Sequence, residues 1–185
     1  LAERSQNIPK PDLKQVQPEN RIAYNGDGTY LRYQGHEVSP FPKPGSPGSY
    51  VANGSEHDVY GDTTHLPEHH VHMTERRFGK LELLQDGEYE GENTNAPIAV
   101  LPWGASKGPT REAYETLRAN GIDLGWYYTI YLHPLPTKLL EELRQKELVL
   151  VPELNYQGQF SLVLRSMGVR AKSITQYTGL PFKVG

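Results

Sequence analysis

The sequence predicts an α/β domain over residues 97–185, with an open, mainly parallel sheet in a three-layer α/β/α arrangement. Two observations support this fold: short apolar runs alternate with amphipathic helical patterns, and glycine or proline bounds most of them. Four strands that alternate with three helices are typical of parallel sheets with right-handed crossovers. In residues 1–50, seven prolines interrupt every candidate helix, which predicts an extended, proline-rich arm.

The first predicted strand covers residues 98–101 and leads into a loop with Gly104 and Gly108. This loop has neither the glycine spacing of a dinucleotide-binding fingerprint nor that of a Walker loop. A helix is predicted from Pro109 to Asn120, because its apolar residues recur at helical spacing. The remaining predicted elements are a strand at 122–132, a helix beginning at Thr137, a strand at 148–151, a helix at 160–167 and a strand at 173–177.

The segments before residue 97 predict less regular structure. Two β-prone runs in residues 22–33 flank an Asn-Gly-Asp-Gly turn, which predicts a hairpin within the arm. Gly-Asp-Gly followed by Asn53 also occurs in thiamine diphosphate and magnesium sites, but no buried strand leads into it, so we favour a turn. Residues 51–96 predict a polar loop, a helix beginning near Pro67, and an acidic linker at 85–96.

Composition excludes several classes of function. The 185 residues include no cysteine, so the chain can form neither disulfides nor cysteine-ligated iron–sulfur clusters. Lys and Arg number 9 against 15 Asp and Glu in residues 1–96, and 10 against 7 in residues 97–185. Neither half has the basic excess of a nucleic-acid binder, and no apolar run is long enough for a membrane span. We therefore expect a cytoplasmic excerpt of a longer polypeptide, without membrane or nucleic-acid partners.

Candidate ligand or interface residues lie in two loops that follow predicted strands. Parallel strands bring such loops together at one edge of the sheet. Lys107 could neutralise a phosphate or carboxylate there, although a solvated lysine remains the simpler alternative. The amide side chains could bind a ligand or a neighbouring chain, or they could cap a helix. The candidates are Ser106, Lys107, Glu153, Asn155, Gln157 and Gln159.

Five of the seven histidines lie between positions 57 and 72, so a metal site must be considered. His65 and His69 are four residues apart, but Pro67 separates them near a helix start. No His-Glu-x-x-His pattern or third carboxylate ligand accompanies them. We therefore predict a hydrogen-bonded loop that enters a surface helix, and no metal site.

An ordered set of motifs resembles a known family. The set contains Ser39-Pro40 with Pro44-Gly45, Glu56-His57-Asp58 with Gly61, His70 and Met73 with Arg76-Arg77, Trp103-Gly104, Pro134 with Pro136, Glu153-x-Asn155, and Gly179-x-Pro181-Phe182. Together these motifs resemble the C-terminal part of the α subunit of 2-oxoacid:ferredoxin oxidoreductases, most like the 2-oxoglutarate type. The chain departs from the family at Val59, where an acidic residue is frequent, and at Arg76, where lysine is usual. The motif leaves the roles of Glu56, His57, Asp58, His70, Arg76 and Arg77 open.

The resemblance implies a fold similar to the transketolase C-terminal domain. It also implies an enzyme that converts a 2-oxoacid, coenzyme A and oxidised ferredoxin to acyl-CoA, CO2 and reduced ferredoxin. In such enzymes thiamine diphosphate and Mg2+ lie between the N-terminal domain of the α subunit and the β subunit, which carries the iron–sulfur cluster. Because the substrate motif of the family is absent from this chain, we expect no catalytic residue and no activity in it alone.

The partners implied are the N-terminal domain of the same subunit, the β subunit and, through the complex, ferredoxin. Under this hypothesis the chain is an accessory or interface domain. The alternative is a free-standing ligand-binding or structural interaction module without catalysis.

Overall fold

The computed structural model describes residues 12, 21–26, 28–35 and 38–183. The chain divides into two compact units, Leu1–Lys80 and Leu81–Gly185. The division falls shortly before the acidic segment at 85–96 that the sequence predicts as a linker. Part of that segment instead forms a strand of the second unit.

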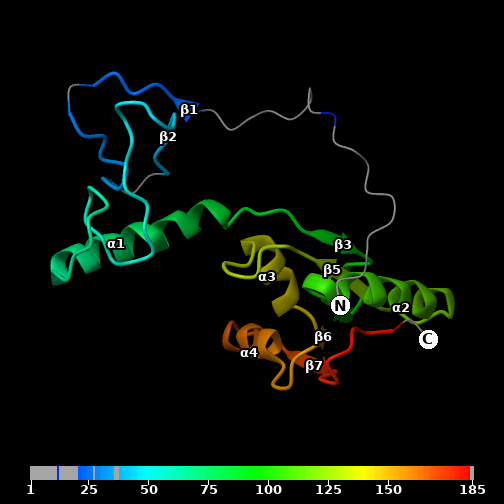
Figure 1. Ribbon diagram of the computed structural model, residues 1–185. Coiled ribbons are helices and arrows are strands. Elements are labelled where there is room, and N and C mark those ends of the chain that lie inside the picture. Colours follow the sequence, from blue (N-terminus) through cyan, green and yellow to red (C-terminus); the bar gives the residue numbers. More distant parts are fainter. Residues whose placement is uncertain (1–11, 13–20, 27, 36–37, 184–185) are drawn as a thin grey trace. The chain divides into compact units, whose positions relative to one another are not determined.

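The second unit is built on a five-stranded sheet with the strand order β3-β5-β4-β6-β7. Its strands are β3 (Glu90–Glu92), β4 (Ile98–Val100), β5 (Gly125–Tyr128), β6 (Leu148–Glu153) and β7 (Ala171–Thr175). Strands β4 to β7 pair in parallel, and β3 pairs antiparallel with β5. Figure 1 labels β3, β5, β6 and β7 of this sheet. The mostly parallel sheet predicted from the sequence is therefore confirmed. Strand β3 was not predicted, because its three exposed residues lack apolar alternation.

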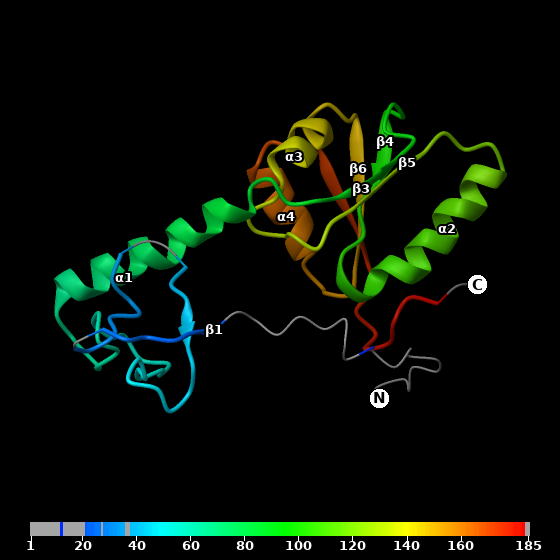
Figure 2. The same cartoon turned by 90° about the horizontal axis from the view of Figure 1, so that it is seen from above.

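Helices cover the two faces of this sheet unequally. Helices α3 (Thr137–Arg144) and α4 (Gln159–Ser166) lie on one face, and α2 (Lys107–Ala119) lies on the other (Figure 2). Leu139, Leu143 and Leu164 are fully buried against the first face. On the second face, the ring of Tyr114 lies 5.5 Å from that of Trp126. The apolar stripes of the helices therefore pack against both faces of the sheet.

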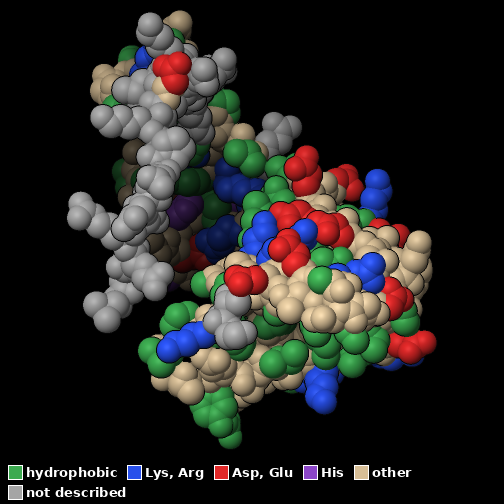
Figure 3. Space-filling view, turned by 90° about the vertical axis from the view of Figure 1, so that its right-hand side faces the viewer, with side chains coloured by type: hydrophobic (Ala, Val, Ile, Leu, Met, Phe, Trp, Pro, Cys, Tyr) green, Lys and Arg blue, Asp and Glu red, His purple; other side chains and the backbone are tan. Residues whose placement is uncertain are grey.

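Helix α2 leaves part of its face open. A groove of about 230 Å3 runs between α2 and the neighbouring strands β6 and β7. Tyr114 and Leu117 line its helix side, and Leu150 and Ile174 line its sheet side. Figure 3 looks onto this side of the unit and shows hydrophobic side chains at the surface.

Strand β5 is shorter than the sequence predicts. The apolar run covers residues 122–132, but the strand is limited to Gly125–Tyr128. At the start of the run, the backbone N–H of Ile122 donates to the carbonyl of Leu117 and so belongs to the end of α2. At the other end, the Thr129 hydroxyl donates to the carbonyl of Glu88 and also accepts from the N–H of Tyr131. The residues at both ends of the apolar run therefore form hydrogen bonds outside the β-sheet ladder, and β5 is limited to its centre.

The first unit contains α1 (Pro67–Gly79), with Pro67 in its first turn as predicted. A 3-10 helix (Lys80–Leu84) follows it and leads into the second unit. Strands β1 (Arg21–Ile22) and β2 (Phe41–Pro42) form a small parallel pair.

The hairpin predicted over residues 22–33 is wrong. Ile22 pairs with Pro42, which lies beyond the expected second strand. Arg32 explains the difference: its guanidinium donates to the carbonyls of Ser39 and Pro40, each at 2.7 Å. These bonds hold residue 32 against the later segment. Asp27, in the expected turn, lies outside the described residues.

Candidate functional site

The loop after β6 is organised by the Glu153 carboxylate. Glu153 ends β6 and is 1% exposed. Its Oε1 accepts hydrogen bonds from the Ser161 N–H at 3.0 Å and the Ser161 hydroxyl at 2.7 Å. Its Oε2 accepts from the Phe160 N–H at 2.9 Å. The carboxylate therefore satisfies backbone donors of the first turn of α4, which also favours negative charge.

Asn155 completes this arrangement. Its side-chain amide donates to Glu153 Oε2 at 2.8 Å, and its Oδ1 accepts from the Gln159 N–H at 3.0 Å. Burial by itself would raise the pKa of Glu153, but the hydrogen bonds from Asn155, Ser161 and Phe160 outweigh it and hold this pKa below its usual range. The Gln157 and Gln159 side chains are exposed. Glu153 and Asn155 thus build the start of α4, and the two glutamines remain at the surface.

The loop after β4 also uses its polar side chains internally. Ser106 is buried; its hydroxyl donates to the carbonyl of Trp103 at 2.8 Å and accepts from the Trp103 N–H at 3.1 Å. Lys107 Nζ lies 2.5 Å from Glu90 Oε1 of β3 and 3.9 Å from the centroid of the Tyr128 ring. Lys107 therefore pairs with the edge strand of its own sheet.

The two loops meet, as expected for the carboxyl ends of adjacent parallel strands. They line a common cavity of about 170 Å3, formed by Trp103, Ala105 and Ser106 on one side and Pro152 and Leu154 on the other. Crossover connections leave β4 and β6 toward opposite faces of the sheet, so the cavity lies at a topological switch point. Among the described residues that line it, none has an ionisable side chain for acid–base chemistry, and the hydroxyl of Ser106 is bonded to the Trp103 backbone.

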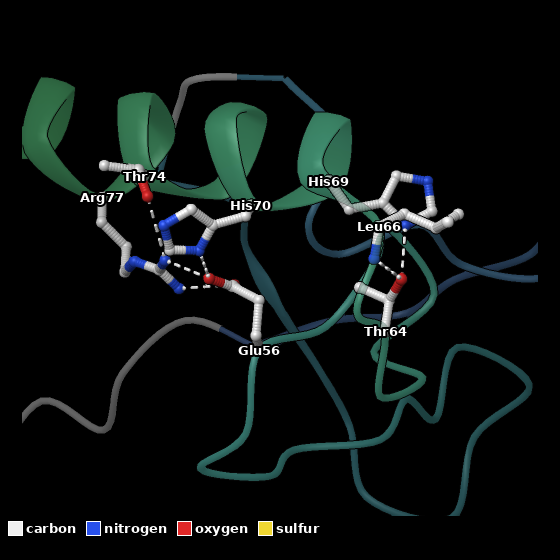
Figure 4. A network of polar contacts seen from close by, with 7 residues as sticks. All are labelled: Glu56, Thr64, Leu66, His69, His70, Thr74 and Arg77. Atoms are coloured by element: carbon white, nitrogen blue, oxygen red, sulfur yellow. Dashed lines mark hydrogen bonds and ion pairs between the residues drawn. The ribbon is translucent and has the colours of Figure 1, made fainter.

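The family-like motif of the first unit forms a network on α1. Glu56 Oε1 and Oε2 lie 3.1 and 3.0 Å from the two terminal nitrogens of Arg77, and Oε2 also contacts His70 Nδ1 (Figure 4). The hydrogen bond from Arg77, followed by that from His70, lowers the pKa of Glu56 to about 2. The Thr64 hydroxyl accepts from the Leu66 N–H at 3.2 Å at the start of the helix. The loop is therefore fastened to α1 at two places.

The other motif residues also stabilise local backbone. Asp58 Oδ1 accepts from the N–H groups of Tyr60 and Asp62, at 2.9 and 3.1 Å. The His57 ring lies 4.2 Å from the Tyr33 ring, and its Nδ1 contacts the Asp58 carbonyl. Arg76 is 5% exposed and donates to the Arg32 carbonyl at 3.2 Å. All six motif residues therefore have local contacts that hold loops and helix together.

The cofactors that the resemblance implies would need ligands, and we find no suitable set among the described residues. Among the described residues, no group of three or more His, Asp or Glu side chains could hold a metal ion. At Gly26, a Cβ would lie 2.5 Å from the Tyr24 hydroxyl, so the Tyr24 ring closely approaches this residue. With no cysteine, the chain has no thiolate for an iron–sulfur cluster. The described residues therefore provide no ligand set for Mg2+, and the chain provides none for a cysteine-ligated iron–sulfur cluster.

A polar cluster inside the second unit was missed by the sequence reasoning. Glu142 of α3 accepts hydrogen bonds from the hydroxyls of Tyr89 at 2.5 Å and Tyr127 at 2.8 Å. The bond to Glu142, with burial, raises the pKa of Tyr89 to about 12. Lys146 is 6% exposed and donates to the carbonyls of Thr94 and Ala96. The sequence signal that could have indicated this cluster is the position of Glu142, which directly precedes Leu143 on the buried side of α3.

Comparisons with known proteins agree with the resemblance in the sequence. Residues 96–178 match the family described as pyruvate:ferredoxin oxidoreductase core domain II. The 2-oxoglutarate oxidoreductase subunit KorA of Mycobacterium tuberculosis is 31% identical over 93% of this chain and 27% of its own length. The 2-oxoglutarate synthase subunit KorA of Methanocaldococcus jannaschii is 34% identical over 55% of this chain and 28% of its own length.

A solved structure is similar along nearly the whole chain. It is a 2-oxoglutarate:ferredoxin oxidoreductase from Magnetococcus marinus, with 2-oxoglutarate, coenzyme A and succinyl-CoA bound. The match has a TM-score of 0.76 at 32% identity and covers 96% of this chain and 32% of that chain. The chain thus spans about a third or less of the length of these relatives.

In the described part of the chain, no helix has the length and apolar character needed to cross a membrane.

The domain match, the aligned relatives and the similar structure agree with one another and with the motifs. The chain belongs to the family of 2-oxoacid:ferredoxin oxidoreductase α subunits.

Proposed function

We propose that this chain is the C-terminal part of the α subunit of a thiamine diphosphate-dependent 2-oxoacid:ferredoxin oxidoreductase. The enzyme would convert a 2-oxoacid and coenzyme A to acyl-CoA and CO2 and pass the electrons to ferredoxin. We further propose 2-oxoglutarate as the 2-oxoacid, because two of the aligned relatives and the similar solved structure carry that substrate in their names.

Within that enzyme we propose an accessory, interface-forming role for this chain, with a domain fold of the transketolase C-terminal type. The observation that carries the proposal is the internal use of the polar residues. Glu153 and Asn155 start α4, Lys107 pairs with Glu90, and Glu56 fastens a loop to α1. Groups already engaged in such bonds support a scaffold better than a catalytic centre. The reacting groups would then belong to the N-terminal domain of the subunit and to the β subunit.

The direct test is to assay the parent α subunit, purified with its β subunit. The assay follows reduction of ferredoxin or of a viologen dye by 2-oxoglutarate in the presence of coenzyme A. We expect activity with 2-oxoglutarate and little with pyruvate. Preference for pyruvate would contradict the proposed substrate. Absence of activity with every 2-oxoacid tested would contradict the proposed 2-oxoacid:ferredoxin oxidoreductase activity.

The accessory role has its own test within the same complex. Ser106→Ala and Lys107→Ala alter the two candidate ligand residues of the β4 loop. We expect kcat and KM for the 2-oxoacid and coenzyme A to change less than about twofold, which corresponds to less than about 0.4 kcal/mol in transition-state free energy. A tenfold or larger rise in KM for either substrate would place that loop in the binding site.

A further inference from the structure

The groove beside α2 has an apolar floor that the described chain only partly covers. Leu150 and Ile174 come from adjacent strands, and Ile174 is 47% exposed. Leu117 of α2 forms the opposite wall and is 42% exposed. Sheets of parallel strands normally have both faces covered, because crossover helices pack on each side. Here two helices cover one face, and α2 alone covers part of the other (Figure 2).

The charges at the groove have one sign. Lys172 is the register partner of Leu150 in the parallel pair of β6 and β7, so the two side chains point to the same face. Lys183 lines the groove at its other end, and both lysines are exposed. None of the described residues that line the groove is acidic. A segment that carries an apolar stripe and carboxylates would therefore match the apolar floor of the groove and the two lysines beside it.

The chain itself already enters this groove. Phe182 lines it with Lys183, at the end of the described residues. The relatives are also much longer than this chain, which covers 27% of one and 32% of another. A segment of the same subunit that lies outside this chain is therefore available to cover the groove beside Phe182.

We propose that this groove holds an acidic amphipathic helix contributed by the same α subunit, which completes the helical layer on the α2 face. The helix would place its apolar stripe on Leu117, Leu150 and Ile174, and its carboxylates near Lys172 and Lys183. The inference rests on the proposed membership in a longer subunit, and it is independent of the substrate.

Photo-cross-linking in the full-length α subunit, purified with its β subunit, tests the occupant. Benzoylphenylalanine is placed at the position of Ile174, and in a matched control at Leu162 of α4, which is 48% exposed on the other side of the sheet. We expect position 174 to cross-link to one acidic, helical segment of the same subunit, and position 162 not to reach that segment. A cross-link that doubles the mass of the subunit, reaches the β subunit or maps to residues 1–20 would overturn the proposal. An unreacted, water-quenched probe at position 174 would overturn it as well.

Charge reversal tests the acidic character of the helix. Lys172→Glu should increase amide hydrogen exchange several-fold in the segment identified by cross-linking, because like charges would then face each other. Lys138→Glu, at an exposed position of α3, is the control and should leave that segment unchanged. Equal effects of the two variants would contradict the charge match. Because these readouts do not depend on ferredoxin reduction, failure of the activity assay and failure of the docking proposal can be told apart.

Discussion

Glu153 is a buried carboxylate whose bonding is completed within its own loop. It accepts from two backbone N–H groups, a hydroxyl and the amide of Asn155. Desolvation penalises its charge, so those four donors are what keep it ionised in the fold. Its effect is therefore on the stability of the β6–α4 connection.

We predict that Glu153→Gln destabilises the chain by about 2–3 kcal/mol, because a charge-assisted bond is lost and an amide NH2 faces backbone donors. Chemical denaturation monitored by circular dichroism measures the change. Glu147→Gln is the control: its side chain is exposed, and such changes stay within about 0.5 kcal/mol. Equal stabilities of the two variants would contradict the role assigned to Glu153.

The same residue predicts a pH dependence. Its pKa is lower in the folded chain than in the unfolded chain, so its stabilisation is present above the unfolded pKa of about 4.3 and is lost as pH falls through the folded value. The stability difference between the parent chain and Glu153→Gln should therefore shrink as the pH is lowered below about 4. A difference that stays constant over this range would show that Glu153 acts without its charge.

Gly158 precedes α4 in the left-handed conformation, with φ +66°. A Cβ there would lie 2.6 Å from the Cβ and hydroxyl of Ser173. We predict that Gly158→Ala lowers the free energy of unfolding by about 1–2 kcal/mol through the left-handed backbone alone. The clash with Ser173 should lower it further. Gly179→Ala is the matched control, because Gly179 has φ +78° with no atom within 4 Å of its Cβ position, so it isolates the backbone contribution. Denaturant titration of both variants compares them, and equal losses would exclude the clash.

At the scale of elements, α1 and the loop at 53–64 depend on each other. The Glu56 carboxylate contacts His70 and Arg77, which lie about two turns apart on the helix, and the Thr64 hydroxyl accepts from the N–H of Leu66, immediately before the helix. A loop with so few apolar contacts opens at low free energy unless side chains hold it.

We predict that Arg77→Ala raises amide hydrogen exchange in residues 53–64 without changing the β-sheet of the second unit. Arg118→Ala, which removes an exposed pair with Asp123, serves as control and should leave the loop unaffected. Because the pKa of Glu56 is lowered to about 2, its ion pair should persist in the parent chain at pH 4 and be lost only as pH falls through that value. Unchanged loop exchange in Arg77→Ala would show that other contacts hold the loop.

At the scale of the whole molecule, both buried clusters belong to the second unit. The larger one includes Leu139, Val149 and Leu164, and the smaller one includes Tyr114 and Trp126. No buried residue of either cluster comes from the first unit.

We predict that residues 81–185 fold when expressed alone and unfold cooperatively on heating. A single transition in near-ultraviolet circular dichroism, which reports the packing of Trp126, is the measurement. Its exposed groove should make this piece associate at high concentration, and Ile174→Lys should reduce that association. A broad, non-cooperative transition would show that the first unit is needed for folding.

How far the sequence predicts this protein depends on how local each signal is. Apolar runs bounded by glycine and proline predicted β4, β6, β7 and the three helices, because these signals act over neighbouring residues. Strand β3 and the hairpin were mispredicted, since long-range contacts decide both. Lys107 and Arg111 reach back to Glu90 and Glu92 on β3, and Arg32 binds the carbonyls of Ser39 and Pro40.

The sequence by itself determined the α/β class, the order of the parallel elements and, through its motifs, the family. Only the tertiary structure decided what the polar residues of those motifs do. The sequence predicts Glu153 as a candidate ligand or interface residue, and only the positions of the Phe160 and Ser161 N–H groups show that it caps α4. A carboxylate's role depends on which donors the fold brings within hydrogen-bonding distance. That proximity is a property of the packed chain, so periodicity and spacing could not reveal it.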